Sequence, residues 1–385
     1  MRDFALEVYF SKWEFAAKYN LAGSDCENMK LSELLELASP EDRAAFEALS
    51  LGYTETFGAP ALREQIAQTY ETVGPQHLLC FAGAEEAIYA AMQVLLGAGD
   101  HAIVITPNYQ AAETVPLSIC EVTGVALDIA RNWDLDIDLL RAALRPNTKL
   151  ISINFPNNPT GKIPARDTFD AIVEICRSRG IWLFSDEVYR LIERDANRRL
   201  PQAADVYERG ISLNVMSKAY GLAGLRIGWL ACKDRAMLVR FERFKHFLSI
   251  CNSAPSEVLA RIALKSRETI LARNRAVVRD NLGVLNGFFA DYGHLFDWRE
   301  PDGGCIGFIR YKGAEGVEEF TRRLVEESGV LFLPSSIYRS ELGPVPENCL
   351  RVGFGRSHVP KGVAVLRAWL EANQPQQMKS LGRQT

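Results

Sequence analysis

Several features that would point to particular functions are missing from this sequence. Only five of its 385 residues are histidine, none in an HExxH pattern, and its eight cysteines form no CxxC pair. These absences argue against a metal site, and scattered cysteines are typical of reduced core thiols in a cytoplasmic protein. No run approaches 18 apolar residues, and the first residues are too charged for a signal peptide.

An excess of positive charge is missing as well. The formal net charge is −4, so no basic field predicts binding to nucleic acid or to an anionic membrane surface. What is present is an ordinary globular balance, with 48% apolar and 24% charged residues. The length is about right for two packed domains.

Short apolar runs alternate with helical patterns between residues 53 and 252, which predicts an α/β fold with a mostly parallel sheet. We expect a large domain over residues 50–255 and a smaller α+β domain formed by residues 1–49 and 256–385. Ligands in such sheets bind at the carboxyl ends of the strands. The expected strands are 77–81, 102–106, 150–154, 181–185, 211–215, 225–231 and, in the smaller domain, 305–310; the helical patterns are 61–72, 85–96, 165–179, 254–289 and 361–371.

The strongest motif, SKAYGLAGLRIG, runs from Ser217 to Gly228. Lys218 follows the expected strand 211–215, and Arg226 comes eight residues later in a glycine-rich turn that lets backbone approach a ligand. A lysine desolvated beside another cation has a lowered pKa and becomes a nucleophile for a carbonyl. The alternatives are a surface lysine and a dinucleotide loop, but the latter precedes a helix, whereas this turn leads into a strand.

Two more motifs follow expected strands. Asp186, in FSDEVY, is an acid at the end of an expected strand, and Tyr189 lies three residues further on. A helix N-cap is the alternative for Asp186. The motif NFPNNPTG contains Asn158 and is a turn by its proline and glycine content.

The segment GAEEA at residues 83–87 joins a strand to a helix. Free N–H groups at that helix start, together with the helix dipole, can hold a phosphate. An ordinary capped helix is the alternative. Tyr109 follows the strand 102–106, either as a ring-stacking aromatic or as a core residue.

In this order the motifs resemble those of class I and II aminotransferases, and the resemblance covers nearly the whole chain. These enzymes have the fold type I of pyridoxal-5′-phosphate (PLP) enzymes. The resemblance implies that Lys218 holds PLP as a Schiff base, that Asp186 pairs with the ring nitrogen, and that Tyr189 and Asn158 bind the phenolic oxygen. It also implies that Tyr109 stacks on the ring.

The resemblance extends to the phosphate, the substrate and a second subunit. Arg226, Ser217 and the N–H groups of Ala84 and Glu85 would bind the phosphate, and Tyr53 would reach the phosphate of the neighbouring subunit in a homodimer. Arg351, whose planar fork suits a carboxylate, would bind the substrate together with Asn158. The expected substrates are an L-amino acid and a 2-oxo acid, and we expect no metal, nucleic acid or membrane partner.

Four positions depart from the family pattern. Val215 replaces a residue that is commonly Ser, Thr or Gly, and Glu85 replaces Ser or Thr, so we expect the Glu85 side chain to point away from the phosphate. Cys305 stands where an aromatic is usual, and Ser335 where Gly is usual.

One alternative function stays open at this point, and a second is disfavoured. The stretches 217–226 and 247–250 also resemble capreomycidine synthase, which predicts a PLP-dependent lyase or cyclase as the alternative function. A PLP-dependent transcription regulator is disfavoured, because the residues before Tyr53 leave no room for a winged-helix domain.

Overall fold

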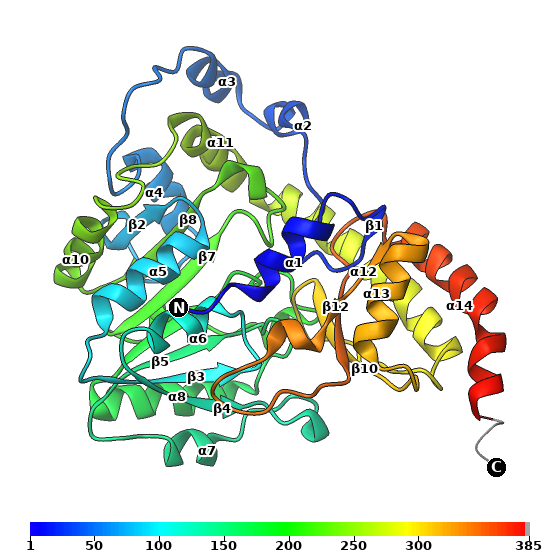
Figure 1. Ribbon diagram of the computed structural model, residues 1–385. Helices are drawn as coiled ribbons and strands as arrows, with labels where there is room; N and C mark the ends of the chain where they lie inside the picture. Colours follow the sequence, from blue (N-terminus) through cyan, green and yellow to red (C-terminus); the bar gives the residue numbers. More distant parts are fainter. Residues whose placement is uncertain (382–385) are drawn as a thin grey trace.

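A seven-stranded sheet forms the centre of the computed structural model, which describes residues 1–381, with side chains to residue 373 (Figure 1). The strand order is β2-β8-β7-β6-β5-β3-β4, and only β8 runs antiparallel to its neighbours. The predicted mostly parallel α/β sheet is confirmed. Its strands are β2 (Leu78–Phe81), β3 (His101–Thr106), β4 (Glu121–Ala126), β5 (Thr148–Asn154), β6 (Trp182–Asp186), β7 (Gly210–Val215) and β8 (Gly228–Cys232).

Two details of the sheet differ from the sequence prediction. Strand β4 was not predicted, because it is an edge strand in which only Val125 is buried, so it has no continuous apolar run. Strand β8 begins at Gly228 rather than at residue 225. The three residues Ala223–Leu225 form a 3₁₀ turn, and Arg226 has a left-handed φ of 51°, which no strand residue adopts.

Helices cover the sheet, and their apolar faces explain why. In α8 (Arg166–Arg179) the buried residues Phe169, Ile172, Val173 and Cys176 follow the spacing of one helix face. The helix ends at Gly180, whose φ of 64° suits glycine. The other helices of this region are α4 (Pro60–Ala67), α5 (Ala84–Leu95), α6 (Ala111–Leu117), α7 (Ile137–Ala142), α9 (Ala203–Val206) and α10 (Arg235–Lys245).

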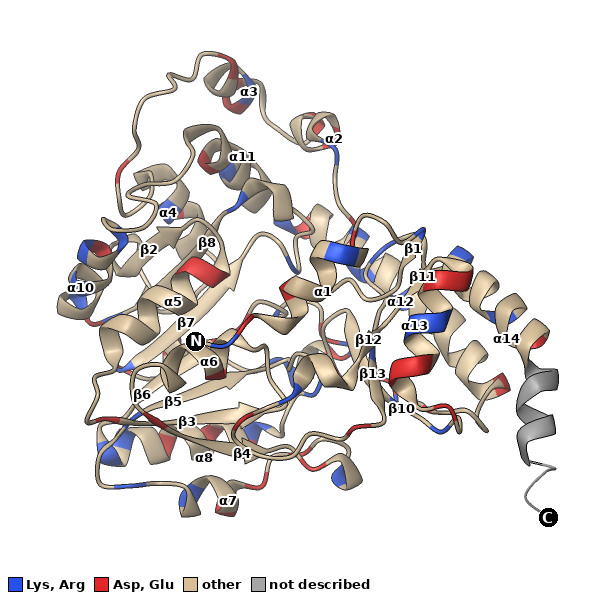
Figure 2. Cartoon of the chain, in the orientation of Figure 1, with Lys and Arg blue, Asp and Glu red and all other residues tan. Residues whose placement is uncertain are grey.

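A second, antiparallel sheet has the order β12-β13-β10-β9, with strands β12 (Leu333–Pro334), β13 (Cys349–Gly353), β10 (Ile306–Tyr311) and β9 (Phe296–Asp297). The helices after the large sheet are α11 (Ala254–Lys265), α12 (Arg267–Asp291), α13 (Val317–Ser328) and α14 (Val359–Leu381). The single helical region predicted over 254–289 is therefore two helices that meet at Ser266. Figure 2 shows acidic and basic segments side by side on α13, where Arg322 bonds Glu319 at 2.6 Å.

The N-terminal residues contribute a strand to a third sheet, which has two parallel strands. Strand β1 (Tyr19–Asn20) pairs with β11 (Val330–Leu331), and α1 (Ala5–Trp13) lies between the large and the small sheet (Figure 1). Helices α2 (Leu31–Glu36) and α3 (Pro40–Glu47) follow. The domain boundaries at residues 50 and 255 stay a prediction. None of the helices within residues 1–381 is both long enough and apolar enough to cross a membrane.

Candidate active site

The carboxyl ends of the central strands meet at one edge of the large sheet. Asn154 at the end of β5 is in register with Asp186 at the end of β6, and Asp186 is in register with Leu213 of β7. A cavity of about 450 Å³ opens at this edge. Nine of the eleven predicted site residues line it: Ala84, Glu85, Tyr109, Asn158, Asp186, Tyr189, Ser217, Lys218 and Arg226. The other two, Tyr53 and Arg351, do not.

Lys218 follows β7 and reaches the cavity with its amine. Its Nζ donates a hydrogen bond to Ser24 Oγ at 3.0 Å. Burial lowers the pKa of Lys218, and the positive charge of Arg351 acts in the same direction, while Asp25, Cys305 and Asp186 oppose it. A lowered pKa increases the fraction of neutral amine, which is the nucleophilic form.

Asp186 and Glu187 are adjacent acids whose side chains lie on opposite faces of the sheet, as strand geometry requires. Asp186 faces the cavity, where burial raises its pKa to about 6 although Val188 N–H and Lys218 favour the charged form. Glu187 is held away from the cavity by Ser212 Oγ and Ala203 N, both at 2.8 Å. Only Asp186 is therefore available to a ligand.

Asn158 connects the turn after β5 to Arg351 on β13. Its backbone N–H donates to Asn154 Oδ1 at 2.6 Å, and its Oδ1 accepts from Arg351 Nη1 at 3.2 Å. Arg351 also donates from Nη2 to the Ala22 carbonyl at 2.6 Å, is 0% exposed, and leaves Nε without a hydrogen bond. No carboxylate among the described residues pairs with this guanidinium. Burying an arginine without a counter-charge raises the free energy of the folded protein unless a ligand anion pairs with the guanidinium.

The start of α5 and the Arg226 turn form a cradle for an anion. A Cβ on Gly228 would lie 2.9 Å from the Gly83 carbonyl carbon and 3.1 Å from Ala84 N, so the two segments approach closely only because glycine has no side chain. The Arg226 guanidinium lies against Gly83, whose φ is 99°. The free N–H groups and dipole of a 12-residue helix face this point together with a cation.

Two tyrosines border the cavity. Tyr189 is buried and its hydroxyl has no hydrogen-bond partner among the described residues, while burial raises its pKa well above the usual range. It therefore remains a protonated donor aimed at a ligand. Tyr109 is held by Phe4, with ring centroids 5.1 Å apart.

The departures from the family pattern fall at different places. Glu85 lines the cavity close enough to Tyr109 for each group to affect the other's pKa, and its expected direction away from the phosphate stays a prediction. Burial raises the pKa of Glu85 to about 7. Val215 is a core residue, and Ser335 Oγ donates to the Glu347 carbonyl at 2.6 Å. Cys305 is fully buried beside Cys26.

Several charged residues at the cavity were not predicted from the sequence, and most of them come from the N-terminal segment. Arg356 forms a two-point ion pair with Asp25 (Nε–Oδ1 3.0 Å, Nη2–Oδ2 2.9 Å). Glu7 and Glu14 also line the cavity. The available signal was the seven-residue spacing of these two glutamates around buried Phe10, which places both on one side of a helix.

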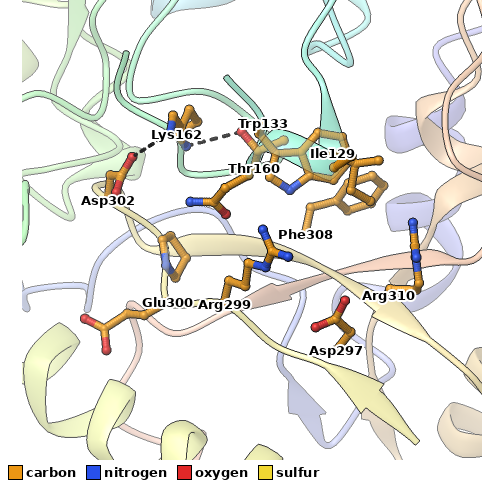
Figure 3. Close-up of a pocket in the computed structure, with 13 residues that line it drawn as sticks. Ile129, Trp133, Thr160, Lys162, Asp297, Arg299, Glu300, Asp302, Phe308 and Arg310 are labelled. Atoms are coloured by element: carbon orange, nitrogen blue, oxygen red, sulfur yellow. Dashed lines mark hydrogen bonds and ion pairs between the residues drawn. The ribbon is translucent and has the colours of Figure 1, made fainter. Parts of the chain in front are cut away.

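A smaller cavity of about 140 Å³ lies behind the Asn158 turn (Figure 3). Its only lysine, Lys162, is already paired with Asp134 at 2.6 Å and with Asp302 at 3.7 Å. Asp302 also accepts from Ile163 N at 3.2 Å. These contacts fix the turn against the segment before β10, so this cavity supports the site rather than forming a second one.

The residues at the sheet edge suit PLP. The anion cradle at α5 suits its phosphate, Asp186 its ring nitrogen, and the unpartnered Tyr189 hydroxyl its phenolic oxygen. The fold and the site together define a PLP-dependent enzyme of fold type I.

The chain belongs to the family "Aminotransferase class I and II", whose model matches residues 18–364. It is 28% identical to the arginine–pyruvate transaminase of Pseudomonas aeruginosa over 82% of each chain. It is 26% identical to the capreomycidine synthase of Streptomyces vinaceus, covering 94% of this chain and 92% of the relative. A PLP-dependent aminotransferase structure from Streptococcus suis superposes with a TM-score of 0.90 and 30% identity, over 96% of this chain and 98% of that one. The protein is an aminotransferase that uses PLP and acts on amino acid and 2-oxo acid substrates.

Proposed function

We propose that this aminotransferase attaches PLP to Lys218 and moves the amino group of an L-amino acid to a 2-oxo acid. One observation carries the assignment: the only lysine in the 450 Å³ cavity has a lowered pKa and follows the strand beside Asp186. When bound, PLP supplies an electron sink for the bond to the substrate α-carbon. The remaining chemistry falls to residues of this chain.

Asp186 keeps a proton on the ring nitrogen by pairing with it. A carboxylate beside a cation has a lower pKa than the same group alone, so a pyridinium N–H would stabilise charged Asp186. Charged Asp186 would in turn stabilise the protonated ring nitrogen. Tyr189 would hold the phenolic oxygen with its unpartnered hydroxyl, and Asn158 would do so with its Nδ2 group, because Asn158 Oδ1 already accepts from Arg351.

Arg351 binds the α-carboxylate of the substrate. Its Nε is unpartnered and its other nitrogens are held by Asn158 and Ala22, so the guanidinium is fixed before a ligand arrives. A carboxylate gives this buried cation a counter-charge that no described residue provides. Lys218 accepts the proton from the α-carbon at Nζ and can return it. Its lowered pKa favours the neutral amine, which acts as the base, and makes the protonated amine a better acid.

A homodimer is part of the proposal. Tyr53 is 94% exposed, and Phe247 and Ile250 are exposed nearby, where Thr54 Oγ1 donates to the Asn252 carbonyl and Ser249 N donates to Glu86 on α5. Exposed aromatic and apolar side chains that lie close together are typical of an interface. In this arrangement Tyr53 serves the site of the partner. The free cysteines of the described chain support a cytoplasmic location.

Elimination followed by cyclisation is the second candidate. The similarity to capreomycidine synthase spans 94% of the chain, and the same cofactor contacts serve both reactions. An amino acid panel with pyruvate and 2-oxoglutarate separates the candidates. Amino-group transfer yields a new 2-oxo acid and a new amino acid in equal amounts. Ammonia release, or a cyclised product without transfer, would support the second candidate and overturn the first.

A further inference from the structure

The charges that line the active-site cavity are unbalanced. Five carboxylates face it but only three cations, which are Lys218, Arg226 and Arg356. In the proposed function Lys218 and Arg226 serve the cofactor, as does one carboxylate, Asp186. Arg356 is already neutralised by Asp25 through two hydrogen bonds. Three glutamates at positions 7, 14 and 85 are left without a counter-charge.

None of these three glutamates forms an ion pair with a lysine or arginine among the described residues. The Oε2 atom of Glu85 is buried and has no hydrogen-bond partner. Burial raises the pKa of Glu14, and Asp25 and Glu7 act in the same direction, whereas Arg356 and Lys218 lower it. Glu7 is exposed and Glu14 is half-buried. Like charges on one side of a cavity repel one another, so a cationic ligand there lowers the free energy of the site.

Helix α1 fixes two of the three carboxylates. Glu7 and Glu14 are seven residues apart, which is two turns of helix, so both project from the same side. The helix is held to the large sheet region by Arg2, which bonds Glu113 at 2.7 Å, and by Ala5 N, which donates to Gln110 Oε1 at 2.9 Å. The acidic side of α1 is therefore a fixed wall of the cavity.

Other buried groups at the cavity await a ligand. The Tyr189 hydroxyl lines the cavity without a hydrogen-bond partner among the described residues. Arg351 does not line the cavity but contacts its wall through Asn158, and it is a buried cation with an unpartnered Nε. An amino acid whose α-carboxylate is bound by Arg351 has its side chain free to extend through the cavity. A neutral side chain leaves the glutamates uncompensated, and an acidic one adds to the repulsion.

We propose that Glu7 and Glu14 bind the positively charged end of the substrate side chain, a guanidinium or ammonium group. This inference rests on the proposed aminotransferase function of the same cavity. It makes the enzyme selective for basic amino acids. A guanidinium suits the site best, because its planar fork can bond two carboxylates at once.

The test compares L-arginine with L-citrulline, which has the same length and shape but a neutral urea group in place of the guanidinium. With the holoenzyme and pyruvate, kcat/KM for arginine should exceed that for citrulline by about tenfold to hundredfold, the range of a charge-assisted hydrogen bond. The double variant Glu7→Gln, Glu14→Gln should bring the ratio close to one by lowering the arginine value alone. The matched control Glu36→Gln removes an exposed charge on α2 outside the cavity and should leave the ratio unchanged.

A binding measurement separates this inference from the proposed function. Calorimetric titration of the holoenzyme compares 5-guanidinopentanoate with 5-ureidopentanoate, neither of which has an amino group to transfer. Tighter binding of the guanidino acid, lost in the double glutamine variant, supports the cation site even if no amino acid is transaminated. Equal binding of the two acids overturns the inference even if transamination is rapid. An effect of the variant on subunit association alone also overturns it, by assigning the glutamates to an interface.

Discussion

At the scale of single residues, the chain position of a reactive group was easier to predict than its surroundings. The placement of Lys218, Asp186 and Asn158 in one cavity followed from parallel strands that end at one edge. The hydrogen bond from Lys218 to Ser24 did not, because 194 residues separate the two in sequence. Contacts of that kind depend on how distant segments pack, which local patterns do not record.

Replacing Lys218 by alanine should abolish covalent attachment of PLP without unfolding the protein. Among the residues that the structure describes, no other lysine lines the cavity, so we expect no neighbouring amine to take over. Borohydride reduction of the wild-type protein followed by mass spectrometry of its peptides should find the phosphopyridoxyl group on Lys218. Its appearance on any other lysine would reject the assignment.

The Asp186→Asn variant should keep PLP but lose activity by a factor of about 10² or more, because a neutral amide no longer stabilises the ring cation. The pKa of Asp186 near 6 adds a pH dependence in the cofactor-free protein. The charged form, which pairs with the pyridinium, predominates above that pH, so the affinity for PLP should fall as the pH drops through 6. This fall should be absent in the asparagine variant. Normal turnover of a PLP-loaded variant would contradict the role.

At the scale of elements, apolar runs predicted the buried strands and missed the exposed one. The six predicted strands of the large sheet all occur, because each is buried on both faces and is therefore a continuous apolar run. Only their ends are shifted. The edge strand β4 has a mixed surface that resembles a loop. The break at Ser266 was equally hidden, because both α11 and α12 have helical periodicity and no proline or glycine separates them.

The contact between β8 and the start of α5 gives a prediction about the phosphate site. In Gly228→Ala the new methyl group would lie about 3 Å from the backbone of Gly83 and Ala84. Such overpacking costs about 1–3 kcal/mol, so the affinity for PLP should fall by about tenfold to hundredfold as the cradle shifts. Gly224→Ala is the control, because no atom lies within 4 Å of its added Cβ. Fluorescence titration of the cofactor-free proteins with PLP measures both, and equal affinities would show that the cradle does not bind the phosphate.

At the scale of the whole molecule, a site shared between subunits would explain why Tyr53 is exposed in a single chain. We expect inactive Lys218→Ala protein and inactive Tyr53→Ala protein to regain activity when mixed, because one of the two sites in the heterodimer is then intact. The mixture of Lys218→Ala with Arg351→Ala should stay inactive, since Arg351 bonds Asn158 of its own chain.

Heterodimer formation must be verified by mass spectrometry under native conditions for this test. Absence of recovery in the first mixture, with heterodimers present, would assign Tyr53 to its own subunit or to no site. A fully active monomer would end the proposal of a shared site.

Helix α1 and its C-cap residue carry two of the cavity's acidic groups, Glu7 and Glu14, and the helix is held by its buried Leu6 and Phe10 and by hydrogen bonds from Arg2 and Ala5. The groups assigned to the chemistry sit on the sheet edge, and those assigned to substrate choice sit largely on one short helix. Substitutions in that helix can therefore change the substrate specificity while the catalytic lysine and its neighbours stay the same. Transplanting residues 4–14 between relatives is the corresponding engineering strategy.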